Sequence, residues 1–315
     1  MDIEITKSDG SKYRLGDYGF YVNDVVISSI ELDRKYESKE NLNGRISTGS
    51  TYQTRTISVP CFYLSKSLAD IPYVRDLLYK LVVDTEPIKI REMRKKEELN
   101  YRFIQPTSDD YQEMLDNGQP NYRKDKFDDD IFVSGKEYEV MISNVITPKQ
   151  SGKKISFEIE FETTKLPFGV SIGTSLELEK NKKLDLWSSD FDIEWNENDP
   201  MRQYTFENTK GNSFFYHGSA PNDQFNMYKR VKITIGKQTT DFVWNLTHSE
   251  TLKITGITLK PGDVIVYDGI RVYKNGDEIS DKTNVAIPKF RYGYNHFEFN
   301  QIVQKVQFDM KFYYK

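Results

Sequence analysis

The segment from Ile155 to Gly169 is a strongly alternating stretch that ends in an abrupt break. Its apolar positions are Ile155, Phe157, Ile159 and Phe161, and between them lie Ser156, Glu158, Glu160 and Glu162. This period of two predicts a β-strand with one buried face and one solvated face. Pro167 has no N–H for a sheet ladder, and Gly169 tolerates a sharp change of direction, so we expect the strand to stop there. The break predicts a hinge between two domains, residues 1–168 and residues 169–315.

The length and the aromatic content of the chain agree with this division. At 315 residues the chain is too long for one typical core, whereas two domains of roughly 150 residues fit the usual size range. The final segment repeats the alternation with Val306, Phe308, Met310, Phe312 and Tyr314. Aromatic residues make up 14% of the chain, and they favour half-buried pleated surfaces. We therefore expect a mainly β chain.

One segment shows a convincing helical pattern, from Ala69 to Val83. Its apolar residues recur at a spacing of three and four, which places them on one side of a helix; they are Val74, Leu77, Leu78, Leu81 and Val82. The pattern predicts a single α-helix in the first domain that packs on a sheet.

The segment from Arg34 to Thr56 contains too few hydrophobic residues to form core. It is polar and contains Gly44 and Gly49, so it predicts a loop or a long hairpin. Hairpins of this kind can leave one subunit and pair with a neighbour's sheet edge. The candidate contact residues in it are Arg45, Tyr52 and Arg55.

A second polar segment, from Arg91 to Lys136, carries charged blocks of both signs. Such composition predicts a protruding insertion. It is either a solvated surface loop or a contact arm, and its candidate contact residues are Asp128, Asp129 and Asp130.

The second half of the chain reads as short strands joined by turns. Gly211-Asn212, Asp268-Gly269 and Asn275-Gly276 supply residues that adopt positive φ in tight hairpins. Strands at this spacing predict an antiparallel β-sandwich. The segment from Thr174 to Leu186 is expected to be a linker or an edge strand.

Charge and cysteine content exclude several classes of function. The formal charge is −4, and residues 1–168 carry all of it because residues 169–315 hold 19 basic and 19 acidic residues. Neither half has the basic excess that nucleic-acid binding requires. A single cysteine excludes an internal disulfide, and the apolar runs are too short to span a membrane. The three histidines lie far apart, so we expect no catalytic set, metal site or cofactor.

The three tryptophans leave two alternatives open. Trp187, Trp195 and Trp244 all lie in the second half of the chain. They either stack on sugar rings, as in a carbohydrate-binding module, or belong to the core of the sandwich.

The order of several motifs resembles one known family. In the first half these are GFYVNDVVISSIELDR, RISTGSTYQTRTISVP, IPYVRDLLYKLV, EPIKI, VMISNVI and ISFEIEFETTKLPFG. In the second half they are FENTKGNSFFYHGS, KRVKITI, ITLKPGDVIVYDGIRVYKNGD and IPKFRYGYNHFEFN. Together they are similar to the siphophage distal tail proteins, known as Dit, over nearly the whole chain. The charged segment from Arg91 to Lys136 departs from the compact hairpin expected there.

The resemblance implies a structural protein of the virion rather than an enzyme. It implies a hexameric ring built by a β-sandwich-like first domain at the tail tip, with a lumen through which DNA passes, and a peripheral second domain that is galectin-like or carbohydrate-module-like. The implied partners are further copies of the chain, the major tail tube protein, the tape measure protein, a tail-associated lysin or fibre protein, and receptor-binding proteins. The implied location is the tail tip or baseplate, with the host cytoplasm as the site of assembly. The alternative is a module that attaches to a bacterial cell-wall glycan.

Overall fold

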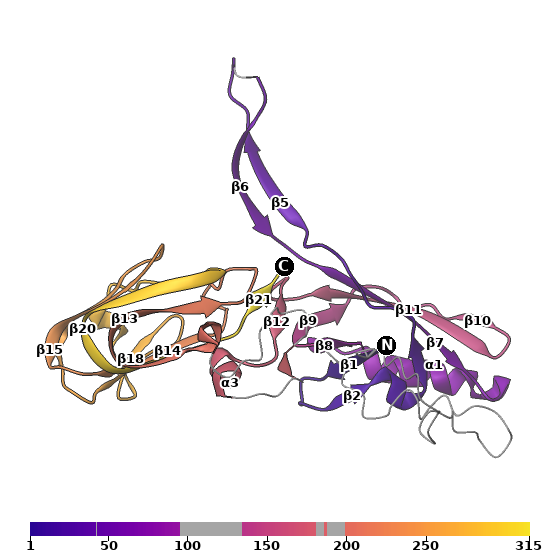
Figure 1. Cartoon of the computed structure of the whole chain (residues 1–315). Coiled ribbons are helices and arrows are strands. Elements are labelled where there is room, and N and C mark those ends of the chain that lie inside the picture. The colour runs from indigo at the N-terminus through magenta and orange to yellow at the C-terminus, as the bar shows by residue number, and fades with distance from the viewer. Residues whose placement is uncertain (42, 95–133, 181–185, 188–198) are drawn as a thin grey trace, which may run out of the picture. The chain divides into compact units, whose positions relative to one another are not determined.

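The chain folds into two compact units, each with its own core. The computed structural model describes all residues except 42, 95–133, 181–185 and 188–198. Unit 1 is Met1–Pro167 and unit 2 is Phe168–Lys315 (Figure 1). The expectation of a mainly β chain with one main helix is confirmed. Among the described residues, no helix has the length and apolarity that crossing a membrane requires.

Unit 1 is built on an antiparallel sheet whose main path runs β2-β1-β8-β9-β11-β7-β3. Its strands are β1 (Asp2–Thr6), β2 (Lys12–Arg14), β3 (Phe20–Val22), β4 (Val26–Ile27), β7 (Thr56–Leu64), β8 (Ile88–Met93), β9 (Lys136–Ile142), β10 (Lys149–Ser151) and β11 (Lys154–Thr163). The short strands β4 and β10 pair with β7 and β11. Two further strands, β5 (Leu32–Glu37) and β6 (Ile46–Tyr52), form a separate hairpin.

The alternating segment forms β11, which lies inside this sheet between β9 and β7. It pairs with β7 in a continuous register in which Ile159 lies opposite Val59. Its four apolar side chains are at most 3% exposed. The solvated and buried faces predicted from the sequence are therefore present, and the buried face forms the centre of the unit 1 core.

The helix α1 (Ile71–Val82) packs on this core through the predicted stripe. Val74, Leu78, Leu81 and Val82 are buried, and burying each contributes about 1.5–3 kcal/mol. Proline in the first turn of α1 costs nothing because the N–H that it lacks has no partner there.

Pro60 lies inside β7 without breaking the sheet. Its carbonyl accepts a hydrogen bond from the N–H of Asn23, at the point where the chain leaves β3 before β4 begins. The N–H and C=O of one strand residue point to the same side of the strand. The nitrogen of Pro60 therefore points to the interruption between β3 and β4 and away from β11, so no hydrogen bond to β11 is lost. The ladder to β11 is left intact.

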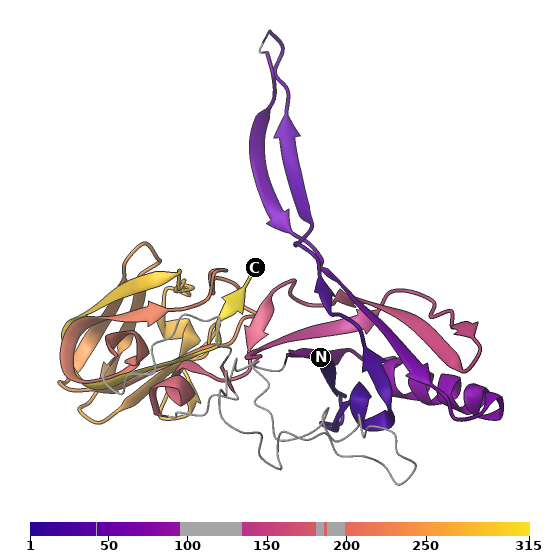
Figure 2. The ribbon, with the colours of Figure 1, turned by 45° about the vertical axis from the view of Figure 1, so that its right-hand side comes forward.

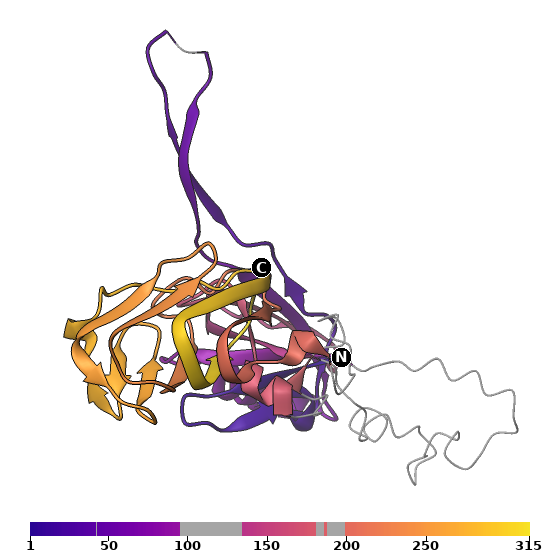
Figure 3. The same cartoon turned by 60° about the vertical axis from the view of Figure 1, so that its left-hand side comes forward.

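Unit 2 is built on a curled antiparallel sheet with the order β16-β15-β20-β14-β17-β18-β19. The strands of this sheet are β13 (Thr205–Tyr216), β14 (Lys229–Ile235), β15 (Thr239–Leu246), β16 (Leu252–Leu259), β17 (Val264–Tyr267), β18 (Val272–Lys274), β19 (Asp277–Glu278) and β20 (Gly293–Met310). Two short strands outside it, β12 (Gly169–Ser171) and β21 (Tyr313–Tyr314), pair with each other. The long strand β20 also pairs with β13, and Figure 3 shows β20 turning through a corner. Because of this corner one strand contributes to both sides of the core.

The core of unit 2 is rich in aromatic rings. The ring of Phe308 stacks on Phe214, with 4.3 Å between ring centres, and lies 4.9 Å from the ring of Phe297. Trp244 lies in the same cluster, 6.1 Å from Phe308. This cluster explains why the second half of the chain is rich in phenylalanine.

The structure corrects two expectations for unit 2. Gly211-Asn212 is not a hairpin turn but lies within β13, where a Cβ on Gly211 would come 2.7 Å from the carbonyl oxygen of Phe297. The glycine is needed for close approach of two strands. The segment from Thr174 to Leu186 contains a short helix, α3 (Ser175–Lys180), and the Glu177 carboxylate accepts a hydrogen bond from the Thr174 N–H at its start.

Lys229 is a buried cation in this unit. Its side chain is 1% exposed, and its Nζ donates a hydrogen bond of 3.3 Å to the carbonyl of Asn222. The ammonium lies 5.9 Å from the centre of the Phe290 ring. Burial lowers the pKa of Lys229 to about 8, although the nearby Asp223 acts in the opposite direction.

The Lys229 pKa makes the stability of unit 2 dependent on pH. Because its folded-state pKa lies below the ordinary value of 10.5, the unfolded chain binds more protons between pH 8 and 10.5. Stability therefore rises with pH in this window, by up to about 1.4 kcal/mol per pH unit. The variant Lys229→Met has no ionisable group at this position. The free energy of unfolding of the natural chain, relative to that of the variant, should therefore rise between pH 8 and 9.5. Urea unfolding of both chains at each pH measures this relative free energy. A difference between the two chains that stays constant with pH would contradict the expectation.

Candidate functional site

The hairpin of β5 and β6 in unit 1 is exposed along both strands. All residues of both strands are exposed, and Figures 1 and 2 show the pair extending away from the sheet. Each strand pairs only with the other among the described residues, so each has a free edge. The prediction of a loop or long hairpin for residues 34–56 is thus resolved in favour of a hairpin.

The base of the hairpin is tied to the sheet by a continuous ladder. The N–H of Ser28 donates to Thr56, and the N–H of Glu31 donates to Thr54, with 3.0 and 2.9 Å between the nitrogen and oxygen atoms. These bonds continue the β4–β7 pairing into the hairpin. The hairpin therefore begins from a fixed position on unit 1.

Several apolar side chains on the hairpin are exposed. Leu32, Tyr36, Ile46 and Tyr52 are each 38–41% exposed. The guanidinium of Arg45 lies 3.9 Å from the centre of the Tyr36 ring. Free strand edges together with exposed apolar side chains are typical of a surface that pairs with another chain.

Of the residues predicted to contact a partner, two are exposed, one is buried and three lie outside the described residues. Arg45 and Tyr52 lie on the exposed hairpin. Arg55 is 5% exposed, and its guanidinium lies 5.7 Å from the Tyr138 ring, so it does not present a surface to a partner. Asp128, Asp129 and Asp130 lie outside the described residues.

The predicted hinge residues lie at the boundary of the two units. Pro167 is the last residue of unit 1. Gly169 begins β12 in unit 2, where it pairs with Tyr314 of β21. The hinge remains a prediction.

Two of the three tryptophans proposed for sugar stacking are buried. Trp187 and Trp244 are 1% and 0% exposed, and both belong to the core of unit 2. Neither ring has a face that a sugar could reach, which favours the core alternative for these two residues. Trp195 lies outside the described residues.

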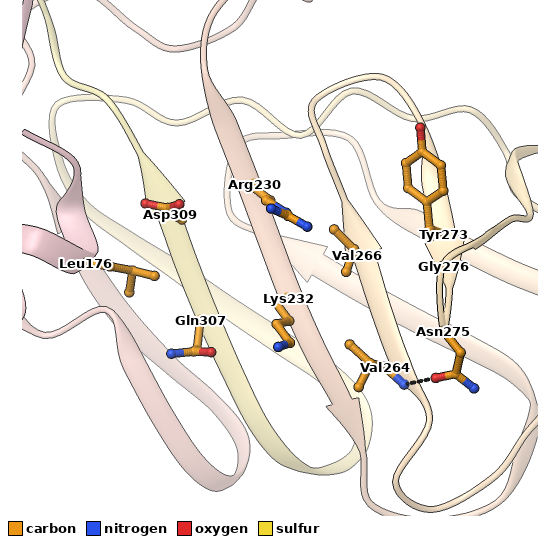
Figure 4. Close-up of a pocket in the computed structure, with 10 residues that line it drawn as sticks. All are labelled: Leu176, Arg230, Lys232, Val264, Val266, Tyr273, Asn275, Gly276, Gln307 and Asp309. Atoms are coloured by element: carbon orange, nitrogen blue, oxygen red, sulfur yellow. Dashed lines mark hydrogen bonds between the residues drawn. The ribbon is translucent and has the colours of Figure 1, made fainter.

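A groove of about 740 Å³ lies on the outer face of the unit 2 sheet. It is lined by Leu176, Arg230, Lys232, Val264, Val266, Tyr273, Asn275, Gly276, Gln307 and Asp309. Figure 4 shows the lining residues of β20, β14, β17 and the β18–β19 hairpin side by side, with Leu176 of α3 beside β20. Sequence reasoning did not find this groove, although the alternation in KRVKITI of β14 places Arg230 and Lys232 opposite to the buried Val231 and Ile233.

The histidines and the cysteine of the chain do not form a reactive cluster. The Nε2–H of His217 donates a hydrogen bond of 3.0 Å to the Met201 carbonyl, and burial lowers the pKa of His217. His296 pairs with the Ser213 hydroxyl, and Cys61 is buried. In the described part of the chain, no three His, Cys, Asp or Glu side chains gather where they could hold a metal ion.

Comparison with known proteins agrees with the fold of unit 1. Residues 8–163 match the family model of the phage tail protein RIFT-related domain. The chain carries a siphophage tail domain. The resemblance to siphophage distal tail proteins is thereby confirmed, and the matched residues span nearly all of unit 1.

The fold of the chain is also similar to that of solved structures. One is the Dit protein of phage SPP1, described as a paradigm of the hub adsorption apparatus in phages that infect Gram-positive bacteria. It is 12% identical, with a TM-score of 0.58 over 98% of this chain and 99% of that chain. Another is the phage p2 baseplate in its activated conformation with strontium, at 7% identity and a TM-score of 0.36 over 98% and 97% of the two chains. No curated protein sequence matches the chain.

The family match thus assigns residues 8–163 to a phage tail protein domain, and the whole chain shares its fold with a solved phage protein.

Proposed function

We propose that this chain forms a hexameric hub at the tip of a siphophage tail, with unit 1 as the ring and unit 2 at its periphery. The observation that carries the proposal is the exposed hairpin β5–β6 on a unit that matches a phage tail domain. A hairpin with two free edges and exposed apolar side chains gains stability by adding to a neighbour's sheet. Head-to-tail contacts of this kind close into a ring when the rotation between copies allows it.

The charge of unit 1 suits a lumen through which DNA passes. Residues 1–168 carry a net charge of −4, so six copies carry −24. Like charge prevents DNA from binding to the wall of the ring. The proposed partners are the major tail tube protein and the tape measure protein on one side, and a tail-associated lysin or fibre protein and receptor-binding proteins on the other. Assembly takes place in the host cytoplasm.

A tagged virion tests where the chain lies. An affinity tag joined after Lys315, which is exposed, is introduced into the phage gene, and purified virions are labelled with gold. We expect gold at the end of the tail that is distal to the head, with virions lacking the tag as the control. Gold on the head, gold along the whole tube, or tagged chain that is absent from virions would each count against the proposal.

A further inference from the structure

The groove on unit 2 is built from one row of residues that crosses four strands. Gln307, Lys232, Val266 and Tyr273 are direct cross-strand partners in the registers of β20 with β14, β14 with β17, and β17 with β18. Direct partners share one face of a sheet, and so does Arg230, which lies two residues before Lys232. The two cations therefore point into the same groove, about 7 Å apart along the strand (Figure 4).

The two cations of the groove differ from the basic residues of the surrounding strands in their ion pairing. Nearby basic side chains are neutralised by carboxylates: Lys274 pairs with Asp263 at 3.2 Å, Lys305 with Glu207 at 3.2 Å, and Arg271 with Glu278 at 3.5 Å. Within the described ranges, neither Arg230 nor Lys232 forms an ion pair, and both are exposed. Two cations that line a groove without a carboxylate partner are suited to an anionic ligand.

Among the described residues, Asp309 is the one acidic residue that lines the groove. It lies opposite Arg230 in the register of β20 with β14, and its Oδ2 accepts a hydrogen bond of 2.7 Å from the Tyr228 hydroxyl. This bond holds the carboxylate at the β20 side of the groove, while Lys232 lies nearer to Gln307 (Figure 4). The described residues of the lining, Arg230, Lys232 and Asp309, thus carry an excess of one positive charge.

The rest of the lining suits the carbon skeleton of a sugar or polyol. Val264, Val266 and the Tyr273 ring provide apolar surface, and the Gln307 amide provides a hydrogen-bonding group. Aromatic and aliphatic side chains beside a few polar groups are typical of small-molecule sites of this volume. Two cations in a unit with no net charge are too few for a nucleic acid, whose binding needs more phosphate contacts.

An extended acidic peptide fits this groove less well than a polyol does. Peptides usually add to the edge of a sheet, where free N–H and C=O groups receive their backbone. This groove lies on a face, and the backbone groups beneath it are engaged in the ladders of β14 with β17 and β20. A peptide backbone would find no partners there, whereas hydroxyl groups bond to side chains.

We propose that the groove binds a hydroxyl-rich polymer that carries anionic groups, either a phosphodiester-linked polyol or an acidic glycan, with Arg230 and Lys232 binding the anions. The site goes beyond the hub role, because it lies wholly within unit 2 and needs no contact between copies. Attachment of a tail tip to a charged polymer of a cell surface is a use that such a site could serve.

Binding of defined polymers to the full chain tests the proposal. The probes are poly(glycerol phosphate), polygalacturonate, neutral dextran and polyglutamate, each titrated by calorimetry at low and at physiological salt. We expect binding of poly(glycerol phosphate) or polygalacturonate, weakened by salt, and no binding of dextran. The first two probes decide whether the anion is a phosphate or a carboxylate.

A double variant shows whether the groove is the binding site. Arg230→Gln with Lys232→Gln should weaken binding about 100-fold, since each charged contact contributes about tenfold. The matched control is Lys253→Gln with Arg291→Gln, which removes the same charges from exposed residues outside the groove and should change binding less than twofold. All four residues are exposed, so unfolding curves should be unchanged.

Three outcomes would overturn the proposal. The first is that neither poly(glycerol phosphate) nor polygalacturonate binds, and the second is that the groove variant binds as well as the natural chain. The third is that polyglutamate binds as tightly as these two polymers, which would indicate an acidic protein segment as the ligand. The groove variant should retain the same number of copies per particle as the natural chain. Failure of the polymer site and failure of the ring are therefore measured separately.

Discussion

Replacing residues 34–50 by an Asn-Gly dipeptide should leave unit 1 folded and abolish the ring. Asp33 and Thr51 are direct partners in the hairpin, and a two-residue Asn-Gly turn closes strands in that register. The change removes most of β5 and β6 but none of the buried core. We expect the proposed particle of six copies to fall to one, because most of the free edges and the exposed side chains of Tyr36 and Ile46 are lost together.

Two controls separate loss of assembly from loss of folding. The far-ultraviolet circular dichroism and the melting temperature of the shortened chain should show that the sheet of unit 1 is intact. The variant Lys253→Gln with Arg291→Gln changes only the surface of unit 2 and should keep six copies. A shortened chain that still forms six copies would show that the hairpin does not hold the ring together.

Truncating Phe308 to alanine should unfold unit 2 at a much lower temperature without affecting unit 1. Phe308 is 0% exposed and contacts the rings of Phe214, Phe297 and Trp244. Removing such a ring costs about 3–5 kcal/mol because a cavity remains. In a domain of this size that corresponds to a fall of roughly 10 °C in the melting temperature.

Tryptophan fluorescence makes this effect specific to one unit. All three tryptophans lie in unit 2, so their emission reports the unfolding of unit 2 alone. The matched variant is Phe161→Ala, which truncates a fully buried ring in the unit 1 core and should leave the fluorescence transition unchanged. One transition that shifts equally in both variants would contradict the description of two separate cores.

The sequence predicted those parts of the fold that depend on local patterns. The strand from Ile155, the helix stripe of α1 and the polar hairpin were all visible, because each periodicity or composition lies within one continuous segment. The turn at Asn275-Gly276 was predicted for the same reason, and both residues have positive φ. Local chemistry is sufficient where the structure is local.

The parts that were missed depend on how strands pair. Gly211 was predicted to lie in a turn, but a glycine pattern alone does not distinguish a turn from a close approach to Phe297. The groove is assembled from residues on several strands, so it appears only when the register is known. The burial of Trp187 and Trp244 also follows from tertiary packing rather than from their neighbours in the chain.

The mass of the intact chain in solution tests the hub most directly. Light scattering on the purified protein, alone and mixed with the major tail tube protein of the same phage, gives the number of copies per particle. The account predicts six copies of 36.9 kDa, about 221 kDa for the ring itself. A single copy of 36.9 kDa under both conditions would contradict it.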